Sequence, residues 1–231
     1  MEENCHEFCT SKVSIFNVLE EESQAKVSDY IVHRKYPQGT FICLEDDEIA
    51  SFIVIHSGEA KLSRFDSDGK EQVLDILKPG SFFGEDFLFS TEHYNYNATA
   101  ITDVETCEFT LASIHSIIKD YPRVSKQLMG DLLVKLRKYE NMISSLSKKD
   151  AMGKVAYVLV ELAKDDGVID ANDTNKVCLT LSLSRDNFAS YAGVTRETLS
   201  RKLTQLEKDG YLINEGKVLT ILDFAKLKNL L

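Results

Sequence analysis

The sequence lacks several features that would assign it to a particular class of protein. It has no tryptophan, only 3 prolines, and 5 cysteines among its 231 residues. An odd number of cysteines does not make the disulfide framework of a small secreted protein. The first residues, MEENCHEF, hold no basic region followed by an apolar one, and no apolar run is long enough to span a membrane. We therefore expect a cytoplasmic protein that has no membrane partner.

Recognisable enzyme signatures are also missing. We find no pairing of a nucleophile with a base, no P-loop and no repeat of metal ligands. The acidic pairs Asp46–Asp47 and Asp165–Asp166 fall in predicted loops. We therefore predict no catalytic residue and no metal site, and we expect that the protein is not an enzyme.

The negative charge of the chain is unevenly distributed. The net charge is −10, but residues 1–147 hold 14 Lys and Arg against 25 Asp and Glu, a balance of −11. Residues 148–231 hold 13 against 12, a balance of +1. A nearly neutral C-terminal part leaves room for a local surface that binds phosphates.

Periodicity and turn signals divide the chain into four parts. Residues 20–36, acidic at the start and basic at the end, predict a short helix. Between residues 37 and 111, short apolar or alternating runs, SFFGEDFLF at 81–89 among them, predict the strands of a jelly roll. The predicted fold class is α+β, and its parts are an N-terminal cysteine-bearing segment (1–18), a β domain (19–121), a long helix (122–149) and a helical domain with a hairpin (150–231).

The long helix carries apolar side chains at heptad spacing. Successive members are 3, 4, 3, 4 and 3 residues apart, which favours a helix packed on a parallel partner and thus a homodimer. A core helix of a single domain is the alternative. Pro122 suits the first helical turn. The predicted dimer seam consists of Met129, Leu132, Leu136, Tyr139, Ile143 and Leu146.

Residues 184–221 carry the pattern of a helix-turn-helix followed by a hairpin. Ala189 allows two helices to approach, Gly193 supplies the turn, and Leu199 anchors the second helix on the first. Ser184 and Thr195 stand where N-caps are needed. Residues 211–221 predict a hairpin that turns at 214–216 and forms a wing.

The second helix of this motif is predicted to read DNA. It begins at Arg196 and presents polar side chains from its first turns, the end that enters the major groove in this motif. Arg201 can donate two hydrogen bonds to guanine, and Glu197 can accept one from cytosine. An ordinary helix pair with a solvated charged face is the alternative. The predicted DNA-binding residues are Arg196, Glu197, Ser200 and Arg201 at the bases, with Lys202, Thr195 and Ser184 at the phosphates.

Four features resemble, in the same order, the Crp–Fnr superfamily of transcription regulators: FIVIHSGEAKLSR, LKPGSFFGE, the long helix and GVTRETLSRKL. The resemblance implies an N-terminal double-stranded β-roll similar to cyclic-nucleotide-binding domains, a dimerisation helix and a C-terminal winged helix. It also implies a homodimer that binds an inverted repeat in double-stranded DNA and contacts RNA polymerase. Arg196 matches the cyclic-AMP branch and Ser200 the Fnr branch, so the half-site is TGTGA-like or TTGAT-like around a shared GA step.

The sensor motif departs from the pattern of the cyclic-nucleotide binders. Gly84 and Glu85 match that pattern, but Asn97–Ala98 stands where the family has Arg-Ala. A neutral Asn cannot replace a bidentate guanidinium at a phosphate. Tyr139–Glu140 replaces the adenine-contacting Thr-Ser. We therefore expect that cyclic AMP is not a cofactor.

The cysteines are similar to those of the Fnr branch, and most similar to the Fnr-like (Flp-type) regulators of low-GC Gram-positive bacteria. Cys5 and Cys9 lie near the N-terminus, and Cys107 matches the distant cysteine of the family. Three thiols suit a dithiol–disulfide switch, whereas a [4Fe–4S] cluster usually takes four. Inert cysteines, an iron–sulfur centre, zinc with His6 as a further ligand, and a small-molecule effector in the roll are the alternatives. The remaining two thiols, Cys43 and Cys178, are predicted to be buried and structural.

Overall fold

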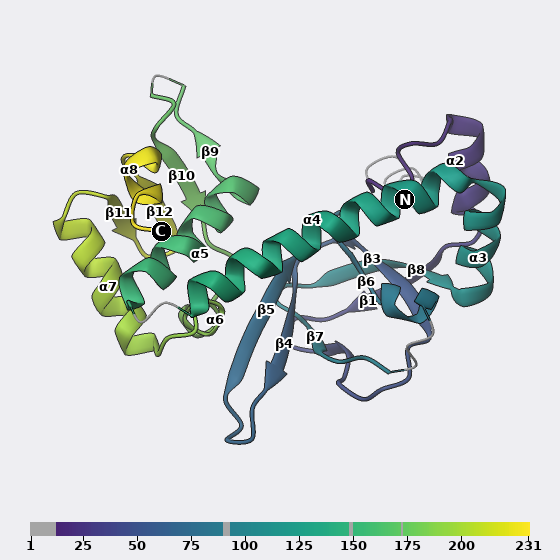
Figure 1. Cartoon of the computed structure of the whole chain (residues 1–231), viewed down its shortest axis with the longest axis horizontal. Helices are drawn as coiled ribbons and strands as arrows, with labels where there is room; N and C mark the ends of the chain where they lie inside the picture. The colour runs from purple at the N-terminus through teal and green to yellow at the C-terminus, as the bar shows by residue number, and fades with distance from the viewer. Residues whose placement is uncertain (1–12, 90–92, 148–149, 172) are drawn as a thin grey trace. The chain divides into compact units, whose positions relative to one another are not determined.

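The computed structural model describes residues 13–89, 93–147, 150–171 and 173–231 (Figure 1). The chain forms two compact units that divide between Leu136 and Arg137, inside a single long helix. Within the described residues, no helix has the length and hydropathy of a membrane span. The sequence predicted four parts, with residues 122–149 as a part of their own. That four-part division stays a prediction.

The N-terminal unit is a roll of two four-stranded antiparallel sheets. One sheet has the strand order β1-β8-β3-β6 and the other β2-β7-β4-β5, so the predicted double-stranded β-roll is confirmed. The strands are β1 (Val32–Tyr36), β2 (Phe41–Cys43), β3 (Ser51–Ser57), β4 (Ala60–Phe65), β5 (Glu71–Leu77), β6 (Phe82–Phe83), β7 (Asn97–Ala100) and β8 (Val104–Thr110). The helical elements of this unit are α2 (Glu21–Ser28), the 3₁₀ helix η1 (Glu85–Phe89), α3 (Leu111–Asp120) and the first part of α4 (Pro122–Leu146).

The two faces of β8 point into different surroundings. Because side chains alternate along a strand, Cys107 and Phe109 share one face while Thr106 and Glu108 share the other. The Phe109 ring meets the ring of Phe16, in the segment before α2, at 5.1 Å between centroids. At Phe109 the first face is thus in contact with the N-terminal segment.

Two predictions for this unit are wrong in part. The predicted helix 20–36 ends at Ser28, and residues 32–36 pair with β8 as strand β1 instead. The run 81–89 is a strand only at Phe82–Phe83. Gly84, at φ 80°, then turns the chain into η1, and a Cβ there would lie 2.6 Å from the carbonyl oxygen of Ser51.

The long helix α4 begins at Pro122, as predicted. Its first turns lie against the roll, where Val124 and Leu128 are buried and Leu132 packs on the same core. Of the predicted seam, Leu132 therefore contacts its own roll. The opposite side of the helix is exposed.

The C-terminal unit packs four helices on a small antiparallel sheet of order β11-β12-β10-β9. Its core combines buried aliphatic side chains, among them Leu159 and Leu199, with the rings of Tyr157, Phe188 and Tyr191. The strands are β9 (Val168–Ile169), β10 (Val177–Thr180), β11 (Leu212–Glu215) and β12 (Val218–Ile221), and the helices are α5 (Ala151–Asp166), α6 (Arg185–Tyr191), α7 (Arg196–Lys208) and α8 (Phe224–Lys228).

Candidate nucleic-acid interface

The helices α6 and α7 form the predicted helix-turn-helix. The Ser184 hydroxyl accepts a hydrogen bond from the Asn187 amide at 3.1 Å, and the Thr195 hydroxyl accepts one from the Thr198 amide at 3.2 Å. Both predicted N-caps are therefore confirmed. Gly193 between the helices has φ 61°, the left-handed conformation that a tight turn needs and that glycine adopts without strain.

Packing determines which side of α7 faces the solvent. Leu199, Leu203 and Leu206 are buried against the rest of the unit. Side chains three and four apart share a helix face, so the residues between these leucines point outward. The exposed set contains Arg196, Glu197, Ser200 and Arg201, while Lys202 is half-buried.

The exposed polar groups of α7 differ in what they already bind. Arg196 contacts Asp186 of α6, with 3.3 Å between Nη1 and Oδ2, and Lys202 donates to Gln205. A backbone N–H at the helix N-terminus, with the Thr195 hydroxyl second, holds the pKa of Glu197 below its ordinary value. Glu197 is therefore an ionised acceptor at neutral pH. The Arg201 guanidinium has no partner within the described part of the chain.

The hairpin β11–β12 is fixed to both helices of the motif. Arg185, the first residue of α6, donates from Nη2 to the Asn214 side-chain oxygen at 2.9 Å and to the Gly216 carbonyl oxygen at 2.8 Å. The Asn214 amide donates to Glu207 of α7 at 3.0 Å. Sequence analysis missed both residues: Arg185 lies 29 residues from Asn214 along the chain, and Glu207, although only 7 residues away, is not part of the hairpin pattern. The predicted wing is thus joined to the reading helix by side chains.

In the roll, the segment after β6 is held by a lysine from α4. The Lys135 ammonium lies 2.7 Å from Glu85 Oε1 and 2.7 Å from the Phe82 carbonyl oxygen, and it stands over the Phe82 ring. Asn97 is buried and accepts from the Glu45 amide at 3.0 Å. Glu85 therefore has a cationic partner within the protein, and Asn97 ties together parts of the roll. No sequence pattern indicated Lys135.

Comparison with known proteins agrees with both halves of this description. Residues 33–121 match the cyclic nucleotide-binding domain, and residues 153–230 match the Crp-like helix-turn-helix domain. The chain belongs to the Crp–Fnr family of transcription regulators. This assignment confirms the resemblance seen in the sequence motifs.

Several Crp–Fnr proteins are similar over nearly their whole length. The CRP-like cAMP-activated global transcriptional regulator of Mycobacterium tuberculosis is 29% identical over 217 residues, 94% of this chain and 96% of that protein. The probable transcriptional regulator flp of Lacticaseibacillus casei is 25% identical, covering 96% and 97%. Among solved structures, FixK2 from Bradyrhizobium japonicum superposes with a TM-score of 0.76 at 26% identity, covering 87% of this chain and 96% of that one.

Cys107, Cys43 and Cys178 lie in different environments. Cys107 is fully buried and disulfide-bonded, and its Sγ lies 3.7 Å from Nδ1 of His33 on β1. Cys43 and Cys178 are free, and only Cys43 is buried as predicted, since Cys178 is half-buried. Burial raises the pKa of the Cys43 thiol to about 12. It is therefore protonated at neutral pH and a poor nucleophile.

Two cysteines and a histidine of the predicted sensor, Cys5, Cys9 and His6, lie outside the described residues. Within the residues that are described, no group of three or more His, Cys, Asp or Glu side chains is placed to hold a metal ion.

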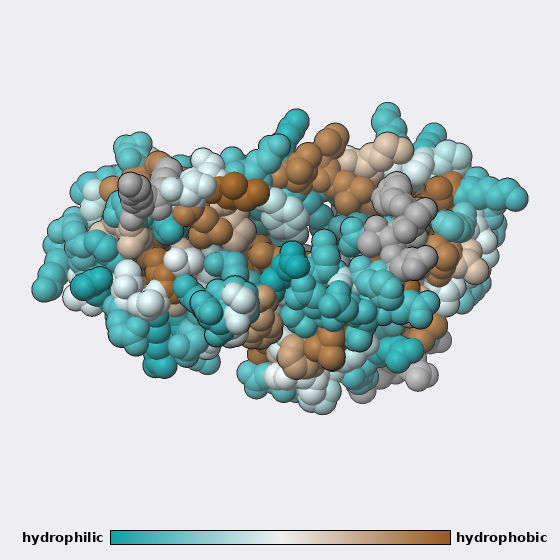
Figure 2. Space-filling view, turned by 60° about the horizontal axis from the view of Figure 1, so that its bottom comes forward, coloured by the Kyte–Doolittle hydropathy of each residue, from teal (hydrophilic) through white to brown (hydrophobic). Residues whose placement is uncertain are grey.

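Large apolar side chains are exposed along one side of α4, where hydrophobic surface is seen in brown (Figure 2). We call this the α4 stripe: Met129, Leu133, Leu136 and Ile143, which are 52–65% exposed. Their spacing of 4, 3 and 7 continues a heptad pattern in which Glu140 takes the missing place. Tyr139 and Leu146 of the predicted seam are half-buried. The stripe thus shares three residues with that seam and includes Leu133, one residue beyond Leu132.

Replacing Arg185 by Ala should detach the wing from the helix-turn-helix. We expect weaker binding to every DNA sequence with little change in which base pairs are preferred, because Arg185 contacts the hairpin and the exposed α7 side chains remain. Two lost hydrogen bonds from a charged donor are each worth about 1.5–3 kcal/mol, so thermal unfolding should also occur at lower temperature. Lys164→Ala is the control, because it removes one positive charge from the same unit and Lys164 pairs with Glu161 of its own helix. A variant that keeps wild-type affinity would show that the contacts do not matter for binding.

Proposed function

We propose that this Crp–Fnr regulator acts as a homodimer and reads an inverted repeat in double-stranded DNA through α7. The observation that carries the proposal is the exposed first half of α7, where an unpartnered Arg201 stands one turn from an ionised Glu197. This pairing of a bidentate donor with an acceptor suits a G·C pair and its neighbour. Arg196 and Ser200 complete the base-reading set, and Lys202 with the caps at Thr195 and Ser184 lies at phosphates.

Arg201→Ala tests the reading helix. Loss of the guanidinium should cost about 1–3 kcal/mol on the specific site and relax the choice at one G·C pair. Lys202→Ala should weaken all sequences alike and reduce the salt dependence, because a phosphate contact carries no sequence information. Both can be measured by fluorescence anisotropy over a range of salt, on a consensus site and on scrambled DNA. Equal losses on both DNAs for Arg201→Ala would contradict its assigned role.

Dimerisation is proposed to run through the α4 stripe. Four exposed apolar side chains at heptad spacing are the pattern by which a parallel helix pair buries its seam. Burial of such side chains is favourable by about 25 cal/mol per Å² of apolar surface. A homodimer also presents two recognition helices to two half-sites, spaced about 34 Å for one turn of DNA. We expect the dimer to be cytoplasmic and to contact RNA polymerase.

Leu136→Glu should split this dimer. The charge would face its symmetry mate, and burying two unpaired carboxylates is costly. Asn141→Glu is the matched control, because position 141 is exposed about 140° around the helix from Leu136. Sedimentation velocity should show monomers for Leu136→Glu and dimers for the control and the wild type. Two dimeric variants would place the interface on another surface.

The signal is proposed to be a dithiol–disulfide switch at Cys107 with Cys5 or Cys9. The buried Cys107 supports it, as does the described part of the N-terminal segment, in which Phe16 packs on the same face of β8. A disulfide in the cytoplasm persists only where it is regulatory. A change at β8 would alter DNA affinity as a coupling free energy between two sites. A small-molecule effector in the roll, an iron–sulfur centre and zinc remain the second candidates.

Cys107→Ser tests the switch. We expect oxidised and reduced wild-type protein to differ in affinity for the same DNA, and this difference to disappear in Cys107→Ser. Cys178→Ser is the control, because that thiol lies in the other unit and should leave the difference intact. Peptide mapping of oxidised protein should find Cys107 joined to Cys5 or Cys9. Equal DNA affinity in both redox states would exclude the switch.

A further inference from the structure

The roll contains a cavity that Cys43 lines and Cys107 does not. Its volume is about 270 Å³, and it lies between strands β1, β3 and β8 of one sheet and the end of β2 in the other. Part of its wall is apolar, from Val32, Ile42 and Ile53. Ligand pockets usually measure about 300–1,000 Å³, so this cavity lies just below that range and would hold only a compact molecule.

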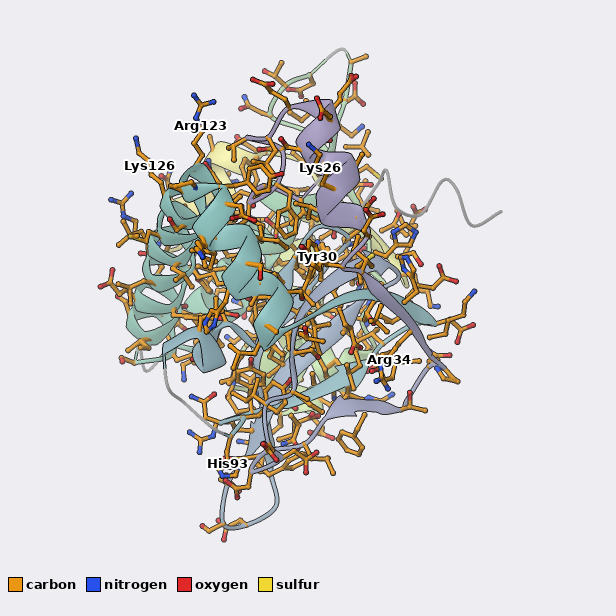
Figure 3. The ribbon with its side chains drawn as sticks, turned by 90° about the vertical axis from the view of Figure 1, so that its right-hand side faces the viewer. Lys26, Tyr30, Arg34, His93, Arg123 and Lys126 are labelled. Carbon is orange, nitrogen blue, oxygen red and sulfur yellow. The ribbon has the colours of Figure 1, made fainter. Side chains whose placement is uncertain are left out.

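One wall of the cavity is a buried and fully bonded carboxylate. Glu108 is only 6% exposed. Its Oε1 accepts from the Tyr36 hydroxyl at 2.9 Å and the Thr106 hydroxyl at 3.1 Å. Its Oε2 accepts from Ser51 at 3.2 Å and lies 3.2 Å from Nε of Arg34. Arg34, labelled in Figure 3, thus neutralises the charge of Glu108.

The lining also includes two exposed carboxylates. Asp47 and Glu48, in the loop after β2, line the cavity and are exposed to solvent. Neither carboxylate is paired with a basic side chain among the residues that the structure describes. Asp47 only accepts the Leu44 amide, at 3.1 Å. Since Arg34 and Glu108 compensate each other, the lining keeps two uncompensated negative charges beside an apolar wall.

We propose that this cavity binds a small organic molecule that carries a primary ammonium group. The ammonium would meet the carboxylates of Asp47 and Glu48, which supply acceptors only, and its aliphatic part would lie on Ile42 and Ile53. A phosphate-bearing nucleotide is disfavoured by the same two charges. A bare metal ion is disfavoured because the described side chains form no group of three such ligands.

Two kinds of small molecule carry a primary ammonium group on an aliphatic chain: amino acids and diamines. An amino acid such as L-lysine offers a carboxylate as well, which the Nη atoms of Arg34 could bind, since only Nε of that guanidinium is engaged. A plain diamine such as cadaverine offers the ammonium groups alone. L-Lysine and cadaverine differ by that one carboxylate, so comparing them separates the two sources.

Isothermal titration calorimetry of the full chain with L-lysine, cadaverine and cyclic AMP tests the proposal. At least one of the two amines should bind, and cyclic AMP should not bind competitively with it. Asp47→Asn and Glu48→Gln should each weaken the amine by at least about tenfold, the value of one lost charge-assisted hydrogen bond. Glu45→Gln is the matched control, because the Glu45 carboxylate pairs with Arg64 and does not line the cavity.

Thermal melting shows that each variant is folded before its titration is interpreted. Tighter binding of L-lysine than of cadaverine assigns the amino-acid source, and the reverse assigns the diamine source. Binding of neither amine to the wild type would overturn the proposal. The proposal would also be overturned if Asp47→Asn and Glu48→Gln bound the amine as tightly as the control Glu45→Gln.

Discussion

The alternation of side chains along β8 is the constraint on which the N-terminal unit depends. The strand is buried on both faces, so each face must be satisfied by a different set of partners. Phe109 lies against Phe16 of the N-terminal segment, whereas Glu108, on the other face, lines the cavity between the sheets. Its two neighbours follow the same phase over most of its length, since β1 pairs with it in register and β3 does so from Ser51 to Ile55, before a bulge. A thiol and a carboxylate one residue apart are thereby kept in separate environments.

In the C-terminal unit, the packing holds exposed polar side chains in a fixed geometry. Local interactions form its helices: two hydroxyl caps start α6 and α7, and a left-handed Gly193 separates them. Buried leucines then set the rotation of α7 about its axis. The buried leucines therefore determine which face of α7 is exposed. Arg201 and Glu197 point to the solvent without needing a contact of their own to hold them there.

The sequence predicted those parts of the structure that depend on neighbours along the chain. The caps at Ser184 and Thr195 and the start of α4 at Pro122 all agree with the structure. It was less informative where distant residues decide. Residues 32–36 form strand β1 because β8 lies beside them and pairs with them. Leu132, predicted to lie in the dimer seam, packs against the roll core instead. Lys135 and Arg185 act on residues far away in the sequence, Glu207 bonds across the turn that follows α7, and no periodicity reports such contacts.

The contacts that join the hairpin to α6 and α7 have a consequence for the nucleic acid. Because Arg185 and Glu207 hold Asn214 from two helices, the wing and the reading helix form one stiff body. A stiff reader does not adjust to the local shape of a duplex, so the duplex must adjust to it. The energy of bending and groove narrowing then falls on the DNA, and it depends on the flexibility of each base step. We expect discrimination among sites to extend to base pairs that no side chain touches.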